Sequence, residues 1–169
     1  MEDSQFTNAL QLIGYFPGAI GKITELHATY YYDNWNLDIS FEAQVGGELS
    51  EFMGNFHEDR DGFWIAMAGG QFAGAIVLDG RESHTKGGRL RWFIVPPEYQ
   101  DRGIGRVLLR RGIAFCKERA YKKIYLWTFK GLDRARALYQ KEGFQLTEEI
   151  AIQQWGTIVT AQKYELPLT

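Results

Sequence analysis

The chain has 169 residues, of which 19 are lysine or arginine and 21 are aspartate or glutamate, so its formal net charge is −2. A chain of this length can bury one hydrophobic core, and we expect residues 1–169 to form a single domain. Binding to nucleic acid without regard to sequence needs an excess of basic residues, which this chain lacks. We therefore expect no nucleic-acid partner.

Cysteine and histidine usage argues against a metal centre or a disulfide framework. The chain has one cysteine, Cys116, and three histidines, without the spacing of a metal site. The N-terminus, MEDSQFTNALQ, lacks the basic start and apolar middle of a secretory signal. The most apolar stretch, residues 63–78, is shorter than the roughly 20 residues that a spanning helix needs. We expect a cytoplasmic protein with no metal and no membrane partner.

The first part of the chain predicts a strand, two helices and then three strands. The first strand ends at Pro17-Gly18, and Ser40 is a good N-cap for the second helix. Gly69-Gly70 divides the apolar stretch into two strands joined by a tight turn. The expected elements are a strand at 10–16, helices at 19–35 and 40–56, a hairpin within 63–78 and a strand at 89–95.

The second part alternates helices and strands. Apolar residues recur at helical spacing over 104–120, a strand follows at 122–129, and a second helix spans 132–144. Gly143 should close that helix, with Phe144 packing back on its last turn. Two strands, within 144–155 and 158–166, finish the chain. This order predicts an α+β fold with a central, mostly antiparallel, twisted sheet and helices on both faces, rather than a doubly wound parallel fold.

The stretch FIVPPEYQDRGIGRVLLRRGIAF, residues 93–115, combines features of an anion site. Pro96 and Pro97 lack amide hydrogens, so strand pairing should stop there and leave a gap. Gly103 and Gly105 lead into a helix whose first-turn amide hydrogens are unpaired and favour a phosphate. Arg102 and Arg106 would add positive charge.

Two well-known phosphate-binding motifs do not fit this stretch. A dinucleotide-binding fingerprint needs a third glycine where Leu108 stands, and a P-loop sequence is absent. The remaining pattern, QxxGxG at 100–105, is followed by ARALYQKEGF at 135–144. Together they resemble the two signatures of the GNAT family of N-acetyltransferases, over at least residues 60–166. The phrases LRWFIV and QWG also resemble acetyltransferase modules fused behind winged-helix regulators, a regulator that we expect to be absent here.

The resemblance implies an acetyl-CoA site. Backbone groups of a strand would pair with the pantetheine arm, and the loop amides would hold the pyrophosphate. The implied cofactor-binding residues are Phe93, Ile94, Val95, Gln100, Asp101, Arg102, Gly103, Ile104, Gly105 and Arg106. Tyr139 matches the family tyrosine that protonates the leaving thiolate as general acid, although its spacing from Ala135 and Leu138 equally fits a core aromatic.

The general base is not evident. Many relatives carry a glutamate on the strand before the loop, whereas RLRWFIV has no carboxylate. Glu42 is the best substitute, because it lies in the region that walls the acceptor side in the family; the alternative is a solvated helix glutamate. Asp38, His27 and His84 are weaker candidates. Leu132 stands where relatives often have an asparagine that contacts the pantetheine.

The run YYYDNWNLDISFE, residues 30–42, is unusually aromatic. Its rings could line an acceptor pocket, hold a cation, pack two helices on the sheet or form a homodimer surface. We expect an N-acetyltransferase that moves an acetyl group from acetyl-CoA to a primary amine of a small-molecule or peptide acceptor by direct attack. The alternative is a non-catalytic module of the same fold that binds or senses acyl-CoA.

Overall fold

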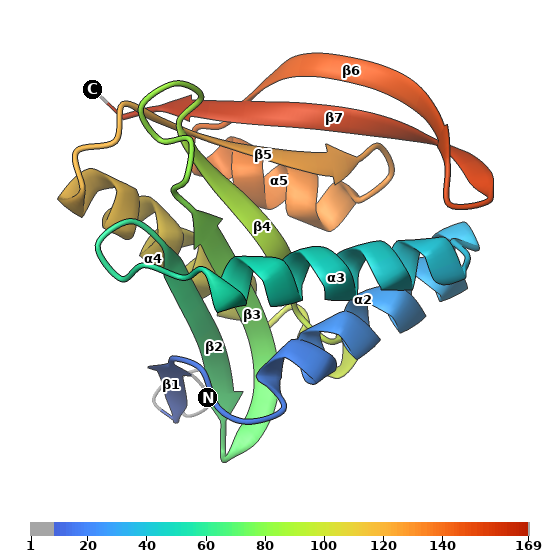
Figure 1. Ribbon diagram of the computed structural model, residues 1–169, viewed down its shortest axis with the longest axis horizontal. Helices are drawn as coiled ribbons and strands as arrows, with labels where there is room; N and C mark the ends of the chain where they lie inside the picture. Colours follow the sequence, from blue (N-terminus) through green and yellow to red (C-terminus); the bar gives the residue numbers. More distant parts are fainter. Residues whose placement is uncertain (1–8, 169) are drawn as a thin grey trace.

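Seven strands form one sheet in the computed structural model, which describes residues 9–168 (Figure 1). Their order across the sheet is β1-β2-β3-β4-β5-β7-β6. All neighbours pair antiparallel except β4 and β5, which run parallel. The strands are β1 Leu10–Ile13, β2 Gly62–Ala68, β3 Gln71–Asp79, β4 Gly88–Ile94, β5 Lys123–Phe129, β6 Gln145–Gln154 and β7 Thr157–Pro167.

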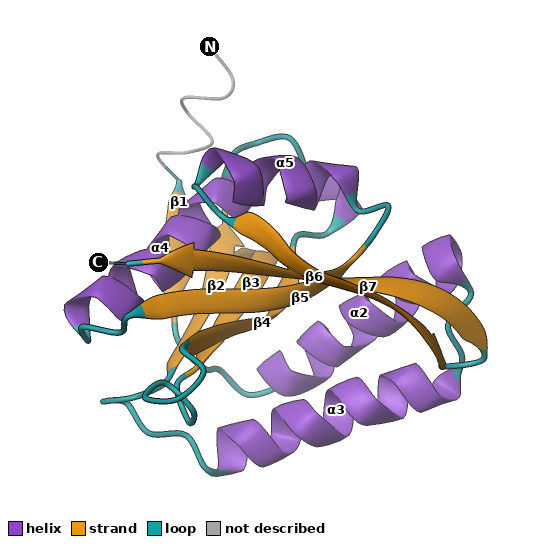
Figure 2. Ribbon diagram, turned by 90° about the horizontal axis from the view of Figure 1, so that it is seen from above, coloured by secondary structure: helices purple, strands orange, loops and turns teal. Residues whose placement is uncertain are grey.

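Helices cover both faces of the sheet, as Figure 2 shows from above. Helices α2 (Ala19–Trp35) and α3 (Ile39–Gly54) pack on one face, and α4 (Ile104–Glu118) and α5 (Asp133–Lys141) pack on the other. A short 3₁₀ helix, η1, spans Pro97–Tyr99. The expected α+β architecture and every expected helix and strand are confirmed, with a first strand shorter than predicted.

Local chemistry explains where the helices begin and end. The N-cap of α3 is Asp38 and not Ser40, because the Asp38 carboxylate accepts the Ser40 amide hydrogen at 2.9 Å. The predicted end of α5 is confirmed: Gly143 has a φ of 96°, and the Phe144 amide donates to the Tyr139 carbonyl at 3.0 Å. None of the helices within residues 9–168 is long and apolar enough to cross a membrane.

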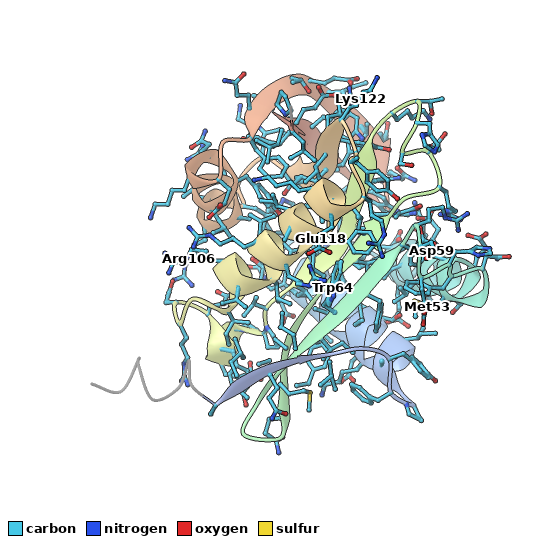
Figure 3. All side chains as sticks on the ribbon, turned by 90° about the vertical axis from the view of Figure 1, so that its left-hand side faces the viewer. Met53, Asp59, Trp64, Arg106, Glu118 and Lys122 are labelled. Atoms are coloured by element: carbon cyan, nitrogen blue, oxygen red, sulfur yellow. The ribbon has the colours of Figure 1, made fainter. Side chains whose placement is uncertain are left out.

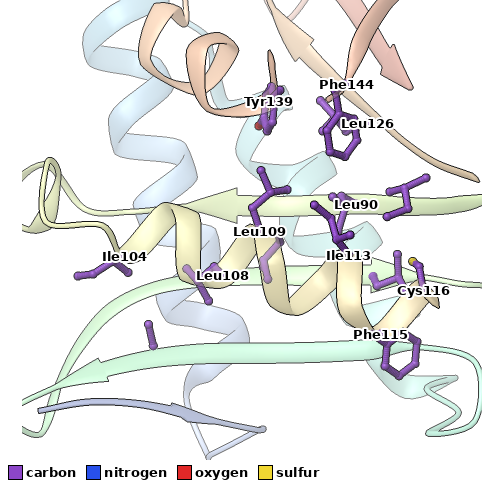
Figure 4. Close-up of a cluster of buried hydrophobic side chains, with 14 of the residues drawn as sticks. Leu90, Ile104, Leu108, Leu109, Ile113, Phe115, Cys116, Leu126, Tyr139 and Phe144 are labelled. Carbon is purple, nitrogen blue, oxygen red and sulfur yellow. The ribbon is translucent and has the colours of Figure 1, made fainter. Parts of the chain in front are cut away.

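The sheet separates two hydrophobic cores. Figure 4 shows the core on the α4–α5 face, where Leu108, Leu109 and Cys116 of α4 pack on the sheet near Tyr139 and Phe144. Burial raises the pKa of the Cys116 thiol to about 12, so this thiol is unreactive. The second core joins α2 and α3 to the opposite face.

Candidate active site

The central feature of the sheet is the point where β4 and β5 separate. Their parallel pairing joins only residues 88–90 of β4 to residues 124–126 of β5. Beyond Leu90, no strand within residues 9–168 pairs with this edge of β4, so its backbone groups face a gap. The sequence predicted that Pro96 and Pro97 end the pairing and open the gap. A gap is present, but the pairing already ends at Leu90, so the prolines do not open it.

A β-bulge at Trp92 reorients the end of β4. Val77 of β3 faces Arg91, while Ala75, two residues earlier, faces Ile94, so β4 carries one extra residue. Trp92 absorbs it with a positive φ of 46°. As a result Trp92 packs in the α2–α3 core and Phe93 packs against the α4–α5 core, the reverse of their places in a regular strand.

One cavity of about 1420 Å³ runs through this gap. At one end it is lined by residues of the loop before α4 and of α5, and at the other by residues of α2, α3, β5 and β6. Nine of the ten predicted cofactor residues line it: Phe93, Ile94, Val95, Gln100, Asp101, Gly103, Ile104, Gly105 and Arg106. The tenth, Arg102, lies over the ring of Tyr99 and does not line the cavity.

The N-terminus of α4 forms the first end of the cavity. Gly103 is the N-cap with a φ of 81°, a conformation that favours glycine, and no side chain caps the helix. The amides of the first turn therefore have no acceptor within the helix. Arg106 projects from this turn, at the opposite end of α4 from Glu118 (Figure 3). The arrangement offers amide hydrogens and a positive charge to an anion.

Gln100 bridges this end of the cavity. Its Nε2 donates to the Val95 carbonyl at 3.1 Å, and its Oε1 accepts from Arg134 Nη1 at 2.8 Å. Arg134 also pairs with Asp101 at 3.2 Å. Arg134, which lines the cavity from α5, was missed by the sequence analysis because nothing local to it indicates that it meets the loop. Because the Val95 carbonyl accepts the hydrogen bond from Gln100, the backbone groups available to a ligand on this edge of β4 are those of Phe93 and Ile94.

Tyr139 lines the middle of the cavity and is 5% exposed. Its ring lies 6.2 Å from that of Phe93, centroid to centroid. Burial raises the pKa of the Tyr139 hydroxyl far above its ordinary value, and electrostatic interaction with the neighbouring Tyr31 and Tyr164 hydroxyls raises it further. The hydroxyl therefore keeps its proton at neutral pH and can donate it in a hydrogen bond.

Aromatic residues of α2 form one wall. Tyr31 lines the cavity, and its ring contacts those of Trp35, Phe41 and Phe129 with centroids 5.0 to 5.7 Å apart. The aromatic run thus does two of the things expected of it, packing the helices and lining the cavity. Burial raises the pKa of the Tyr31 hydroxyl, so it too stays protonated.

His27 also lines the cavity, and it is neutral. Its Nδ1 lies 2.8 Å from the Ile23 carbonyl oxygen, which can only accept, so Nδ1 carries the proton and Nε2 keeps its lone pair. Burial lowers the pKa of His27 to about 4, against the weaker opposing effect of this hydrogen bond.

The structure does not bring Glu42 to the cavity. Residues 41, 44, 45 and 48 of α3 line it, which is one face of the helix at helical spacing. Glu42 lies about 100° around the helix from Phe41 and is exposed. The carboxylate of α3 that does line the cavity is Glu48, paired with Arg91 at 2.5 Å. The sequence contained a signal for this choice: Phe41, Val45 and Glu48 are spaced at four and three residues, so they lie on one face of a helix.

Two of the three weaker candidates, Asp38 and His84, also lie away from the cavity, whereas His27 lines it. Asp38 is occupied as a helix cap, and His84 is exposed in the loop between β3 and β4. Neither lines the cavity, whereas Leu132 does. Within residues 9–168 no group of three or more histidine, cysteine, aspartate or glutamate side chains is arranged to hold a metal ion.

The tip of the β6–β7 hairpin closes the end of the cavity opposite the α4 N-terminus. The Trp155 carbonyl accepts the Asp38 amide hydrogen at 3.0 Å, and Trp155 Nε1 donates to Gln44 Oε1 at 2.9 Å. The Trp155 ring contacts those of Phe41 and Phe129. These contacts fix the hairpin on the start of α3, so the cavity has an aromatic wall at this end.

The model of the acetyltransferase (GNAT) family matches residues 20–144, most of the chain. This chain belongs to the GNAT family. A rat protein named N-acetyltransferase family 8 member 3 is 36% identical over 90 residues, which are 52% of this chain and 40% of the relative. The GNAT chain therefore spans about half the length of the curated relatives that it matches.

Solved structures share the GNAT fold at low sequence identity. A GNAT acetyltransferase from Staphylococcus aureus Mu50 superposes with a TM-score of 0.75 at 22% identity, covering 95% of this chain and 100% of that one. An acetyltransferase from Salmonella typhimurium, solved with its cofactor acetyl-CoA, gives 0.72 at 17% identity, covering 96% and 95%. The resemblance to modules fused to winged-helix regulators stays a prediction.

Proposed function

We propose that the protein transfers an acetyl group from acetyl-CoA to a primary amine by direct attack of the amine on the thioester. The observation that carries this proposal is the single cavity through the β4–β5 gap, which joins an anion-binding helix end to an acceptor face. Two substrates entering from opposite ends would meet beside Tyr139.

The residues at the α4 end fit coenzyme A. The amides of residues 104–106 and the Arg106 guanidinium suit a diphosphate, and the unpaired edge of β4 at Phe93 and Ile94 suits an arm that binds like an added strand. Gly105 has no side chain, which leaves room for a ligand at this end of the cavity. A side chain at this position would begin beside Phe93 and Leu138, which also line the cavity. When bound, the cofactor would supply an activated acetyl group.

Tyr139 is the proposed general acid. Tyr139 lines the cavity, and its protonated hydroxyl would donate to the sulfur of the leaving thiolate. Because its pKa is raised, a hydrogen bond to the thiolate is favoured over complete loss of the proton.

The acceptor amine must be neutral before it attacks. Moving a proton from a lysine-like ammonium, with a pKa of about 10.4, to an imidazole with a pKa of about 4 is unfavourable by about 9 kcal/mol, which makes His27 a poor base. Selecting the minor neutral amine from solution at pH 7.4 costs about 4 kcal/mol. We infer that the amine loses its proton to water, with Glu48 attracting the ammonium form by its charge.

Thiol release with a panel of primary amines tests the proposal, with wild type and Tyr139→Phe compared. Turnover with at least one amine, lost in the variant while coenzyme A binding is kept, is the expected result. Binding of coenzyme A without turnover of any amine would refute the transfer and favour a module that binds or senses acyl-CoA. Small-molecule and N-terminal peptide amines both belong in the panel.

A further inference from the structure

Four arginines line the cavity, and they differ in how they are paired. Arg91 contacts Glu48 and Asp79, and Arg134 contacts Asp101. Arg106 and Arg89 form no ion pair within residues 9–168. Arg106 lies at the end assigned to the diphosphate, so Arg89 is the cavity-lining arginine of the sheet that has no ion pair among residues 9–168.

Arg89 is held in place and incompletely satisfied. It lies on β4, with Asp79 of β3 and Tyr125 of β5 as its strand neighbours. Its Nε atom is buried and has no hydrogen-bond partner among the residues that the structure describes. Burial lowers the pKa of Arg89, and the positive charge of Arg91 lowers it further. An arginine remains charged under these conditions, so an anion that entered here would gain a partner with two or more donors.

The position of Arg89 suits the acceptor rather than the cofactor. It precedes Leu90, the last residue of β4 paired with β5, and lies two residues, about 7 Å along the strand, from the first unpaired position. Arg89 and Arg91 share the face of β4 that carries Trp92, whereas Leu90 packs in the α4–α5 core. This face is the one covered by α3, opposite the helix end that suits the diphosphate.

An apolar surface extends along the cavity from the strand neighbour of Arg89. Trp127 lies two residues beyond Tyr125 on the same face of β5, and Phe129, Ala161 and Ile150 lie further along. Trp127 of β5 and Ile150 of β6 line the cavity and are 36% and 48% exposed, which is high for such side chains. Phe129 and Ala161 line the same region. A ligand with an apolar body would cover this surface and lose water from it.

We propose that the acceptor is an amine that also carries a carboxylate and an apolar side group, with Arg89 binding the carboxylate and the exposed surface of Trp127 holding the side group. The charges along the cavity agree with this orientation. Glu48 from α3 attracts the ammonium, and Arg89 attracts the carboxylate. Arg89 is thus a specificity residue and takes no part in the bond changes. The identity of the site as an acceptor site rests on the proposed acetyl transfer.

Direct binding tests this assignment without requiring turnover. Phenylalanine and phenylalaninamide share the ring and the α-amine and differ in the carboxylate. Isothermal titration of each into protein saturated with coenzyme A should show at least 10-fold tighter binding of phenylalanine. Arg89→Gln should reduce this preference below 2-fold by weakening only the carboxylate ligand, and Arg89→Lys should keep part of it.

Lys163→Gln is the matched control. Lys163 lies over the ring of Tyr125, the strand neighbour of Arg89, but does not line the cavity. Lys163→Gln, like Arg89→Gln, removes one positive charge from this face of the sheet. The preference for phenylalanine over phenylalaninamide should nevertheless persist. Circular dichroism confirms that each variant is folded, and Arg89→Lys replaces Arg89→Gln if the latter unfolds.

Equal affinity for the two ligands in wild type, no binding of either, or an unchanged preference in folded Arg89 variants would overturn the proposal. Carboxylate-dependent binding without thiol release would overturn the proposed acetyl transfer instead and leave the anion site standing.

Discussion

Gly105→Glu separates cofactor binding from folding. Gly105 is the second residue of α4, and a Cβ there would lie 3.4 Å from Phe93 Cζ and Leu138 Cδ2. These are ordinary contacts, so alanine fits. A longer side chain would enter the cavity where we place the diphosphate, and a glutamate would bring a negative charge to it.

This glutamate should weaken the binding of coenzyme A without lowering the stability of the fold. At about 6 Å and an effective dielectric constant of about 20, each pair of like charges repels by about 3 kcal/mol, so coenzyme A should bind at least 100-fold more weakly. Folding should not suffer. Replacing a helical glycine gains up to about 1 kcal/mol, and a carboxylate in the first turn gains about 0.3–1 kcal/mol from the helix dipole.

Calorimetry with coenzyme A and with pantetheine, together with thermal unfolding, measures both effects. We expect Gly105→Glu to unfold at the wild-type temperature or higher, to lose affinity for coenzyme A, and to lose less affinity for pantetheine, which lacks the diphosphate. Gly105→Ala is the control and should bind coenzyme A within about threefold of wild type, since it adds no charge. If Gly105→Glu binds coenzyme A as tightly as Gly105→Ala, the phosphate site at the α4 N-terminus is refuted.

Further predictions concern the residues around the reacting groups. Tyr139→Phe should lower kcat by about 100-fold or more while the Kd of coenzyme A stays constant; an unchanged kcat would return Tyr139 to a packing role. Glu48→Gln should raise the KM of the amine, whereas Glu42→Gln, on the same helix but outside the cavity, should have no effect; the opposite result would restore Glu42 as the candidate base. Because water takes the proton from the amine, kcat/KM should rise about 10-fold per pH unit between pH 7 and 9, and a plateau near pH 7 would reveal a protein base. His27 has a folded-state pKa of about 4, below the ordinary 6.5, so its contribution to stability is complete above pH 6.5 and is lost as pH falls toward 4. The loss is about 3 kcal/mol, and urea titrations of His27→Gln should lack this component of the pH dependence.

The elements of the fold could be read from local pattern because each depends on neighbours in the chain. Pro17-Gly18 and Gly143 mark helix ends, and the periodicity of 104–120 marks α4. The N-cap of α3 was misassigned by two residues, since serine and aspartate are both good caps and only the hydrogen bond to Asp38 decides between them.

The glycine loop before α4 could also be predicted from residues close together in the chain. Gln100, Gly103 and Gly105 lie within six residues, between a strand and a helix, so their spacing alone predicted the loop that the structure places at the cavity. In contrast, the choice of Glu48 over Glu42 depends on which face of α3 turns to the sheet. That face is set by packing against α2 and β4.

By itself, the sequence determined the order of helices and strands, the glycine loop and the family signatures, because these follow from interactions among residues close in the chain. Only the tertiary structure decided where β4 leaves β5, that Arg134 meets Gln100, and that Arg89 Nε is buried without a hydrogen-bond partner among residues 9–168. Those features depend on strand pairing and on contacts between segments distant in sequence, whose geometry is set when the two cores close on opposite faces of the sheet.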